Sequence, residues 1–403
     1  MTRSSLALQF YRTESVMKLA KRIQKVTPSL TLAIEAKAKR LKQEGVDIIS
    51  FSAGEPDFDT PLQVKQAAIE SLNKGFTKYT PASGMLELRK AISEKLSREN
   101  HLAYSPDQIV VSCGAKHSIY NMLQVLIEEG DEVIILSPFW LSFPEMVTLA
   151  GGTSVILKTE FENGYVPSPR ALEKLITKKT KLLILNSPSN PTGAVMTKEL
   201  LKEIAAIAKK HSFFILSDEI YEKLIFDGGT HYSIGSLDPA ILERTITVGG
   251  ASKSYAMTGW RLGFSASAKP IAEACGALQS HSTSNPTSFA QAGYLEALKT
   301  AEADVQNMRA TFEKRRDLIF RLVSDIPKLK PFKPSGAFYL FTDISGTKLP
   351  SLQFADRLLD EAKVAVVPGV AFGDDHTIRI SFATSEKLIE AGIVRIREWL
   401  KKI

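Results

Sequence analysis

Residues 248–263 read Val248-Gly-Gly-Ala-Ser-Lys-Ser-Tyr-Ala-Met-Thr-Gly-Trp-Arg-Leu-Gly263. Lys253 lies on a glycine-rich turn after an apolar strand, and Arg261 offers a forked donor for a phosphate or carboxylate. The stretch is not a P-loop, because Thr247 and Ser252 stand where that motif needs glycine. A lysine can instead act as an amine that forms Schiff bases. Taken alone, Lys253 would be interpreted as a surface residue, so a chemical role for it depends on the rest of the chain.

Four more segments share this organisation, in which a short apolar run ends abruptly in a polar or glycine-containing turn and a helical pattern follows. The five apolar runs are residues 109–111, 133–136, 182–185, 213–216 and 246–248. Continuous apolar strands that alternate with helices predict a mostly parallel sheet, whose ligand binds outside the carboxyl ends of the strands. This rule brings together Gly114, Trp140, Asn190, Asp218, Tyr221 and Lys253.

The predicted fold class is therefore α/β, with a large domain built on this sheet and a smaller α+β domain. We expect an N-terminal arm and part of the small domain in 1–58, the large domain in 59–290 and the small C-terminal domain in 291–403. Ser29 is expected to cap the first helix. A long helical stretch is expected over about 289–322, with Arg315 and Arg316 on its polar face.

Composition argues against several other classes of protein. The net charge of +7 is spread without a basic run, so no nucleic-acid partner is expected. No apolar run approaches the roughly 18 residues of a membrane span. Two cysteines make neither a disulfide framework nor a four-thiolate metal site, which favours reduced thiols and a cytoplasmic protein. No metal site is expected, because the chain lacks a His-rich spacing, and it also lacks the G-x-S-x-G elbow of serine hydrolases.

The first 25 residues are basic, with Glu14 as their single acid. They resemble a transit peptide faintly, and Met17 is an alternative start to Met1. The reading we favour is a plain N-terminal arm.

The polar groups at the strand ends are those that pyridoxal 5'-phosphate requires. Lys253 would hold it as a Schiff base, and Asp218 would keep its pyridine nitrogen protonated, so that the ring acts as an electron sink. Tyr221 and Asn190 would bind the phenolic oxygen, and Trp140 would stack on the ring. Singly, each has a plainer reading, such as a helix cap for Asp218 or a core residue for Trp140. Their joint occurrence in this order favours the cofactor.

The phosphate of this cofactor would lie at a predicted helix start. The backbone N–H groups of Gly114, Ala115 and Lys116 would receive it there, where the helix dipole favours an anion. Arg261 and the hydroxyl of Ser252 would complete the site.

Three segments of the chain resemble signatures of the class I, fold-type-I, pyridoxal-phosphate-dependent aminotransferases. They are Asn190-Pro-Thr-Gly193, Ser217-Asp-Glu-Ile-Tyr221 and Ser252-Lys-Ser-Tyr-Ala-Met-Thr-Gly-Trp-Arg261. Residues 53–58 and 378–385 further resemble the bacterial aspartate aminotransferase and aspartate/prephenate aminotransferase subgroup. The resemblance runs from about residue 22 to the C-terminus.

By this resemblance Lys253 is both the Schiff-base lysine and the proton shuttle of a ping-pong transamination. Arg379 clamps the substrate α-carboxylate, while Gly54, Trp140 and Asn190 contact the substrate. Tyr79 reaches the cofactor phosphate of the neighbouring subunit, which implies an obligate homodimer.

The resemblance also implies a substrate class. Lys116 matches a lysine that binds a distal carboxylate, which favours aspartate or glutamate. Thr27 together with Lys116 fits relatives that also aminate prephenate. Two positions depart from the wider family. Gly250 replaces a common phosphate-binding serine, and His281 lies near where better-known enzymes supply an arginine from the other subunit.

Other readings stay open at this point. An aromatic or broad-specificity aminotransferase, or a lyase of the same fold, would share every cofactor residue. A transcription regulator with an aminotransferase-like domain would need a DNA-binding domain, and about 25 residues ahead of the matched region are too few for one. A plain nucleotide-binding α/β protein would leave Lys253 and Asp218 unexplained and would need a G-x-G-x-x-G motif.

Overall fold

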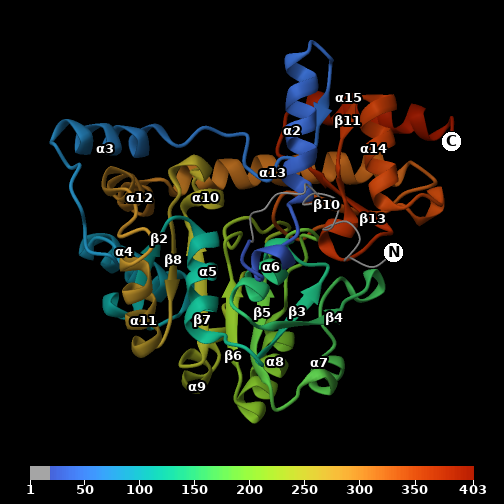
Figure 1. The fold of residues 1–403 in the computed structure, drawn as a ribbon. Helices are drawn as coiled ribbons and strands as arrows, with labels where there is room; N and C mark the ends of the chain where they lie inside the picture. The colour runs from blue at the N-terminus through green and yellow to red at the C-terminus, as the bar shows by residue number, and fades with distance from the viewer. Residues whose placement is uncertain (1–18) are drawn as a thin grey trace.

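The computed structural model describes residues 19–403 (Figure 1). The choice between Met1 and Met17 falls on residues outside that range. Within residues 19–403 no helix combines the length and the apolar character that crossing a membrane requires.

The structure has a large and a small layer. A seven-stranded sheet forms the centre of the large layer, and its strand order is β2-β8-β7-β6-β5-β3-β4. The strand β8 runs antiparallel to both of its neighbours, and the other adjacent pairs are parallel. The predicted mostly parallel sheet is therefore confirmed. Its strands are β2 (Ile109–Ser112), β3 (Glu132–Ser137), β4 (Thr153–Lys158), β5 (Thr180–Asn186), β6 (Phe214–Asp218), β7 (Thr245–Gly250) and β8 (Gly263–Ala266).

Helices cover both faces of this sheet (Figure 1). Successive strand residues point to opposite faces, so an all-apolar strand supplies two cores. In β3, Val133 and Ile135 join the core with α5 and α6, whereas Ile134 joins the core with α8. The helices of this layer are α3 (Leu62–Asn73), α4 (Leu86–Asn100), α5 (Ala115–Leu126), α6 (Ser142–Leu149), α7 (Pro169–Leu175), α8 (Lys198–His211), α9 (Pro239–Leu242), α10 (Ala251–Ser254), α11 (Lys269–Ser280) and α12 (Ser288–Thr300).

A smaller layer combines both ends of the chain. Its antiparallel sheet has the order β12-β13-β10-β9, and β1 pairs in parallel with β11. Ser29 caps α2 by accepting a hydrogen bond from the N–H of Leu32, as expected. The elements are α2 (Leu30–Gln43), β1 (Ile49–Ser50), α13 (Glu302–Ser324), β9 (Lys330–Phe332), β10 (Tyr339–Asp343), α14 (Ser351–Ala362), β11 (Val364–Ala365), β12 (Val367–Pro368), β13 (Thr377–Ser381) and α15 (Glu386–Leu400).

The helical stretch expected over about 289–322 is present, but it is divided into two helices. The stretch forms α12 and α13, which are separated at Ala301. They pack against different partners, α12 against α3 and α4 and α13 against α15 and β9. Helical periodicity does not reveal such a change of partner. The division of the chain into 1–58, 59–290 and 291–403 stays a prediction.

The expected polar-face position of Arg315 and Arg316 is wrong, because both side chains are buried. Arg316 donates to Asp227 at 2.6 Å, and Arg315 donates to Asp57 at 2.7 Å. Buried guanidinium groups require such paired acids. The acids come from distant segments, which the local pattern does not show.

Candidate active site

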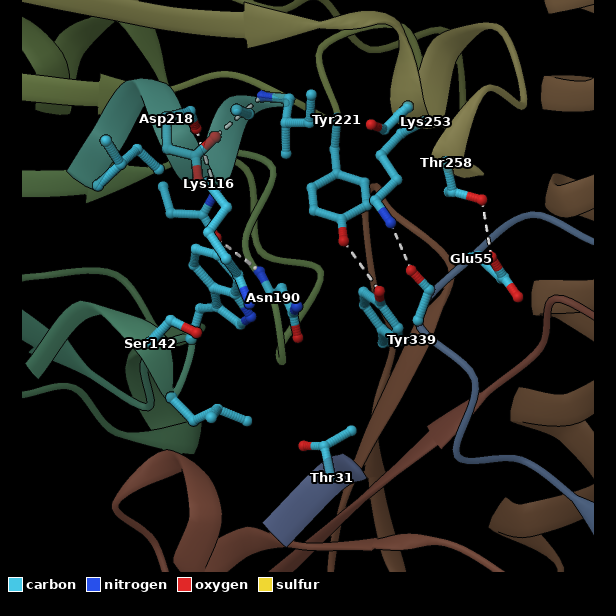
Figure 2. Close-up of a pocket in the computed structure, with 18 of the residues that line it drawn as sticks. Thr31, Glu55, Lys116, Ser142, Asn190, Asp218, Tyr221, Lys253, Thr258 and Tyr339 are labelled. Carbon is cyan, nitrogen blue, oxygen red and sulfur yellow. Dashed lines mark hydrogen bonds between the residues drawn. The ribbon is translucent and has the colours of Figure 1, made fainter. Parts of the chain in front are cut away.

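A cavity of about 390 Å³ lies at the carboxyl ends of the parallel strands, with β10, β13 and the start of α2 on its other side (Figure 2). Most of the predicted site residues line it, although they come from segments as far apart as residues 54 and 379. They are Gly54, Ala115, Lys116, Trp140, Asn190, Asp218, Tyr221, Ser252, Lys253, Arg261 and Arg379.

Three predicted residues lie elsewhere. Gly114 sits just behind the wall with φ +91°, where a Cβ would fall 2.6 Å from Nη2 of Arg261. The backbone N–H of Thr27 donates to the carboxylate of Glu145 at 3.0 Å. Tyr79 is 88% exposed on the outer surface. The cavity of one chain therefore does not contain Thr27 or Tyr79.

Lys253 extends from α10, directly after the buried strand β7, into this cavity. Its Nζ donates to the carbonyl oxygen of Gly54 and lies 5.9 Å from the centre of the Tyr221 ring. Burial lowers the pKa of the Lys253 amine to about 8, against the opposing effect of Glu55. A much larger fraction of this amine than of an ordinary lysine is therefore neutral and nucleophilic near neutral pH.

Asp218 is the last residue of β6, and it is 4% exposed. One carboxylate oxygen accepts the N–H of Ile220 at 3.2 Å. Burial raises the pKa of Asp218 to about 7, with a smaller contribution from neighbouring Glu219. A buried carboxyl group of this kind gains its charge readily when a cation is placed beside it.

Two hydrogen-bonded pairs connect the sheet side of the cavity with the wall opposite it. The hydroxyls of Tyr221 and Tyr339 lie 2.8 Å apart (Figure 2). Arg379 donates to the Asn190 side chain at 3.0 Å and to the carbonyl of Ser52 at 2.9 Å. Because Arg379 is buried without a carboxylate partner among the described residues, it fits a ligand carboxylate.

Sequence reasoning missed Tyr339. Its ring centre lies 4.3 Å from the guanidinium of Arg379, and its hydroxyl meets Tyr221, so it contacts both pairs. The contact with Arg379 is diagonal across β10 and β13, because Phe341 is the residue directly opposite Arg379. Only the strand register reveals it. Also missed in the cavity wall were Thr31, Glu35, Glu55, Ser142, Asn186 and Thr258.

Positive charge gathers near the start of α5. Arg261 donates to the carbonyl groups of Thr258 at 2.9 Å and Cys113 at 3.3 Å, and no ion pair within residues 19–403 involves it. Burial lowers the pKa of Lys116, and the charge of Arg261 lowers it further. Excess positive charge beside a helix N-terminus, with the Ser252 hydroxyl in the same wall, fits a phosphate.

Lys116 projects from the first turn of α5 over the ring of Trp140, with its Nζ 4.9 Å from the ring centre. This position separates it from Arg379, which comes from the small layer. The cavity thus presents two cationic groups from different elements, as a ligand with two carboxylates requires.

Comparison with known proteins identifies the family. A model of the aminotransferase class I and II family matches residues 46–396. The chain belongs to this family. It is 49% identical over 388 residues to an aspartate aminotransferase from Bacillus sp. (strain YM-2), covering 95% of this chain and 99% of the relative. It is 45% identical to the aspartate/prephenate aminotransferase of Thermus thermophilus, covering 94% and 97%.

A solved structure of aspartate aminotransferase from Thermus thermophilus with maleate has a TM-score of 0.92 to this aminotransferase. It is 44% identical and is covered completely, with 95% of this chain. The resemblance stated from the sequence and the predicted fold class are thus confirmed. The chain is an aminotransferase rather than a plain nucleotide-binding protein.

Proposed function

We propose that this aminotransferase uses pyridoxal 5'-phosphate to transfer the amino group of L-aspartate or glutamate to 2-oxo acids. The observation that carries the proposal is the pair of separate cations, Lys116 and Arg379, in the cavity that also holds Lys253. Both named relatives are aspartate aminotransferases, and the Thermus structure was solved with the dicarboxylate maleate, which supports a dicarboxylic substrate.

The residues present fit the proposed cofactor. Arg261, Ser252 and the start of α5 would hold its phosphate, behind Gly114, whose lack of a Cβ leaves room for Arg261. Asp218 would face its ring nitrogen, and Tyr221 with Asn190 would face its phenolic oxygen. When bound, pyridoxal phosphate supplies an electron sink for the α-carbon of the amino acid.

The remaining chemistry belongs to the chain. Arg379 would bind the α-carboxylate of the amino acid and thereby orient its α-hydrogen toward Lys253. Lys253, with its pKa of about 8, would accept that proton at Nζ and return it, because such an amine is close to balanced between its two protonation states. Lys116 would hold the distal carboxylate.

We also propose a homodimer with shared active sites. Large apolar side chains are exposed on α3 and on the segments that follow it, including Leu62 at 63%, Ile69 at 55% and Leu86 at 43%. Exposed side chains of this size, Tyr79 among them, are of the kind that a second subunit covers. Tyr79 would then reach the phosphate in the partner's cavity.

Prephenate is a second proposed amino acceptor. The relative from Thermus thermophilus is named for both aspartate and prephenate. Prephenate also carries two carboxylates, which Arg379 and Lys116 would bind.

The visible absorption spectrum tests the proposal. Purified protein with pyridoxal phosphate is expected to show a visible band that bleaches on addition of L-aspartate and returns with a 2-oxo acid, prephenate included. A band that ignores aspartate would remove the dicarboxylic substrate, and absence of a band would remove the cofactor.

Substitution Lys116→Ala is expected to lower kcat/KM for aspartate by about 10- to 100-fold, the size of one lost charged contact. Aromatic amino acids, which lack the second carboxylate, should lose much less. Steady-state kinetics with aspartate and phenylalanine measure the ratio. Equal losses for both substrates would remove Lys116 from substrate selection.

A further inference from the structure

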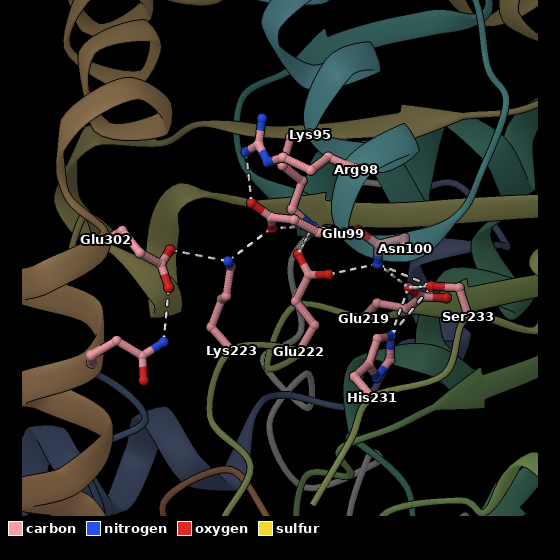
Figure 3. A network of polar contacts seen from close by, with 11 residues as sticks. Lys95, Arg98, Glu99, Asn100, Glu219, Glu222, Lys223, His231, Ser233 and Glu302 are labelled. Atoms are coloured by element: carbon pink, nitrogen blue, oxygen red, sulfur yellow. Dashed lines mark hydrogen bonds and ion pairs between the residues drawn. The ribbon is translucent and has the colours of Figure 1, made fainter.

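A polar network surrounds the turn that follows β6 (Figure 3), and its residues do not line the cavity. Glu219, the neighbour of Asp218, is 2% exposed. Its carboxylate accepts hydrogen bonds from Ser217 at 2.8 Å and from Ser233. His231 lies against the same carboxylate, with Nε2 at 2.8 Å. Asp218 faces the proposed cofactor, whereas Glu219 faces this network.

The charges of the network balance only if His231 is protonated. Its acids beside His231 are the buried Glu219 and the half-buried Glu222, and the ammonium of the buried Lys95 from α4 contacts Glu222 and the Asn100 side chain. With the outer ion pairs included, four carboxylates stand against three cations, which leaves one negative charge; the acids are Glu99, Glu219, Glu222 and Glu302, and the cations are Lys95, Arg98 and Lys223. An imidazolium on Glu219 would cancel it, and buried charges are costly unless they are paired.

The surroundings of His231 favour that charge. One carboxylate oxygen each of Glu219 and Glu222 and one ring nitrogen of His231 lie within 4.8 Å of one another. Burial lowers the pKa of His231, but the two carboxylates outweigh this effect and that of Lys95, so the pKa lies above its usual value. Nδ1 of His231 has no hydrogen-bond partner among the described residues, so the ring is oriented through Nε2, by Glu219 at 2.8 Å and Ser233 at 3.4 Å.

We propose that His231 is a positioning residue of the active site. Its imidazolium group on Glu219 offsets the negative charge behind the end of β6, so that the negative charge acting on the cofactor ring is that of Asp218. The inference rests on the proposed function. Without this offset, Glu219 would oppose ionisation of Asp218, because the two carboxyl groups are adjacent at the end of β6.

The test combines His231→Gln with the double variant Glu219→Gln/His231→Gln. Glutamine keeps an N–H donor for Glu219 but carries no charge, and the double variant removes both charges. The matched control is His211→Gln, because His211 lies on Glu173 at 3.2 Å at the surface of α8. The readout is the pH midpoint of the visible band of the full chain loaded with pyridoxal phosphate.

An uncompensated carboxylate stabilises protonated forms nearby, so His231→Gln is expected to move this midpoint upward, by up to about one pH unit, which is tenfold in the proton equilibrium. The double variant and His211→Gln should stay near the wild-type midpoint. An unshifted midpoint in His231→Gln, or an equal shift in the double variant, would overturn the inference.

Folding of the variants gives a second decision. If His231→Gln unfolds but the double variant folds with the wild-type midpoint, the charge pairing is supported. If both unfold, His231 serves the fold alone and the inference fails. A wild-type protein that shows no band with pyridoxal phosphate would instead overturn the proposed function.

Discussion

Replacing Lys253 by alanine is expected to lower transamination by about 10⁶-fold, the loss typical of removing a covalent catalytic group. Lys253 is proposed both to hold the cofactor and to move the α-proton, and these two roles need one amine on one flexible stem. The neighbouring guanidinium groups of Arg379 and Arg261 cannot replace it, because a guanidinium group is a poor proton acceptor. Single-turnover kinetics with aspartate measure the effect.

The fold is expected to survive this substitution. The pKa of Lys253 is lowered to about 8, so the folded state binds fewer protons than the unfolded state between about pH 8 and the usual value of about 10.4. Stability therefore rises with pH through that window, and below pH 8 the buried charge is a cost. Alanine removes this cost.

Thermal unfolding at pH 7 should accordingly show Lys253→Ala at least as stable as the wild type, less the packing lost with the side-chain stem. Lys202→Ala, at an exposed lysine on α8, is the matched control and should keep full activity. Turnover by Lys253→Ala at even one per cent of the wild-type rate would contradict both proposed roles.

The sheet side of the cavity could be predicted from the sequence, because it follows from a local sequence pattern and one topological rule. Each apolar run ends where its polar residue begins, and parallel strands bring these ends to one edge. Asp218, Asn190 and Lys253 could therefore be placed together without knowing any contact. Their chemical roles stay predictions.

The other wall of the cavity could not be placed in this way. Arg379 was found through the family resemblance, whereas Tyr339 depends on the register between β10 and β13. The network of Glu219 and His231 depends on packing of α4 against the turn after β6. The break at Ala301 depends on a change of packing partner. None of these long-range relations has a signature in a short window of sequence.

Substitution Asp218→Asn is expected to lower kcat by about 10²–10³-fold, as for loss of one preorganised electrostatic contact. The amide has nearly the same size and keeps an oxygen for the N–H of Ile220. It cannot carry the negative charge that keeps a ring nitrogen protonated, so the electron sink is weakened. Stopped-flow measurement of the bleaching of the visible band by aspartate isolates this step from product release.

Asp360→Asn, at an exposed carboxylate that pairs with Lys37 at 3.0 Å, is the matched control and should bleach at the wild-type rate. A mild effect of Asp218→Asn, within a factor of two or three of this control, would limit the role of Asp218 to holding the turn through the N–H of Ile220. The spectrum before aspartate is added confirms in the same experiment that the cofactor is bound.

Stability of the protein without cofactor provides an independent measurement of the same charge. The pKa of Asp218 is raised to about 7, so the folded state binds more protons than the unfolded state between about pH 4 and pH 7. Wild-type stability should therefore fall through this window as pH rises, relative to Asp218→Asn, which has no such charge. If the stabilities of the two proteins depended on pH in the same way, the surroundings of Asp218 would not oppose its charge. The proposed pairing of Asp218 with a ring cation would then lose its electrostatic basis.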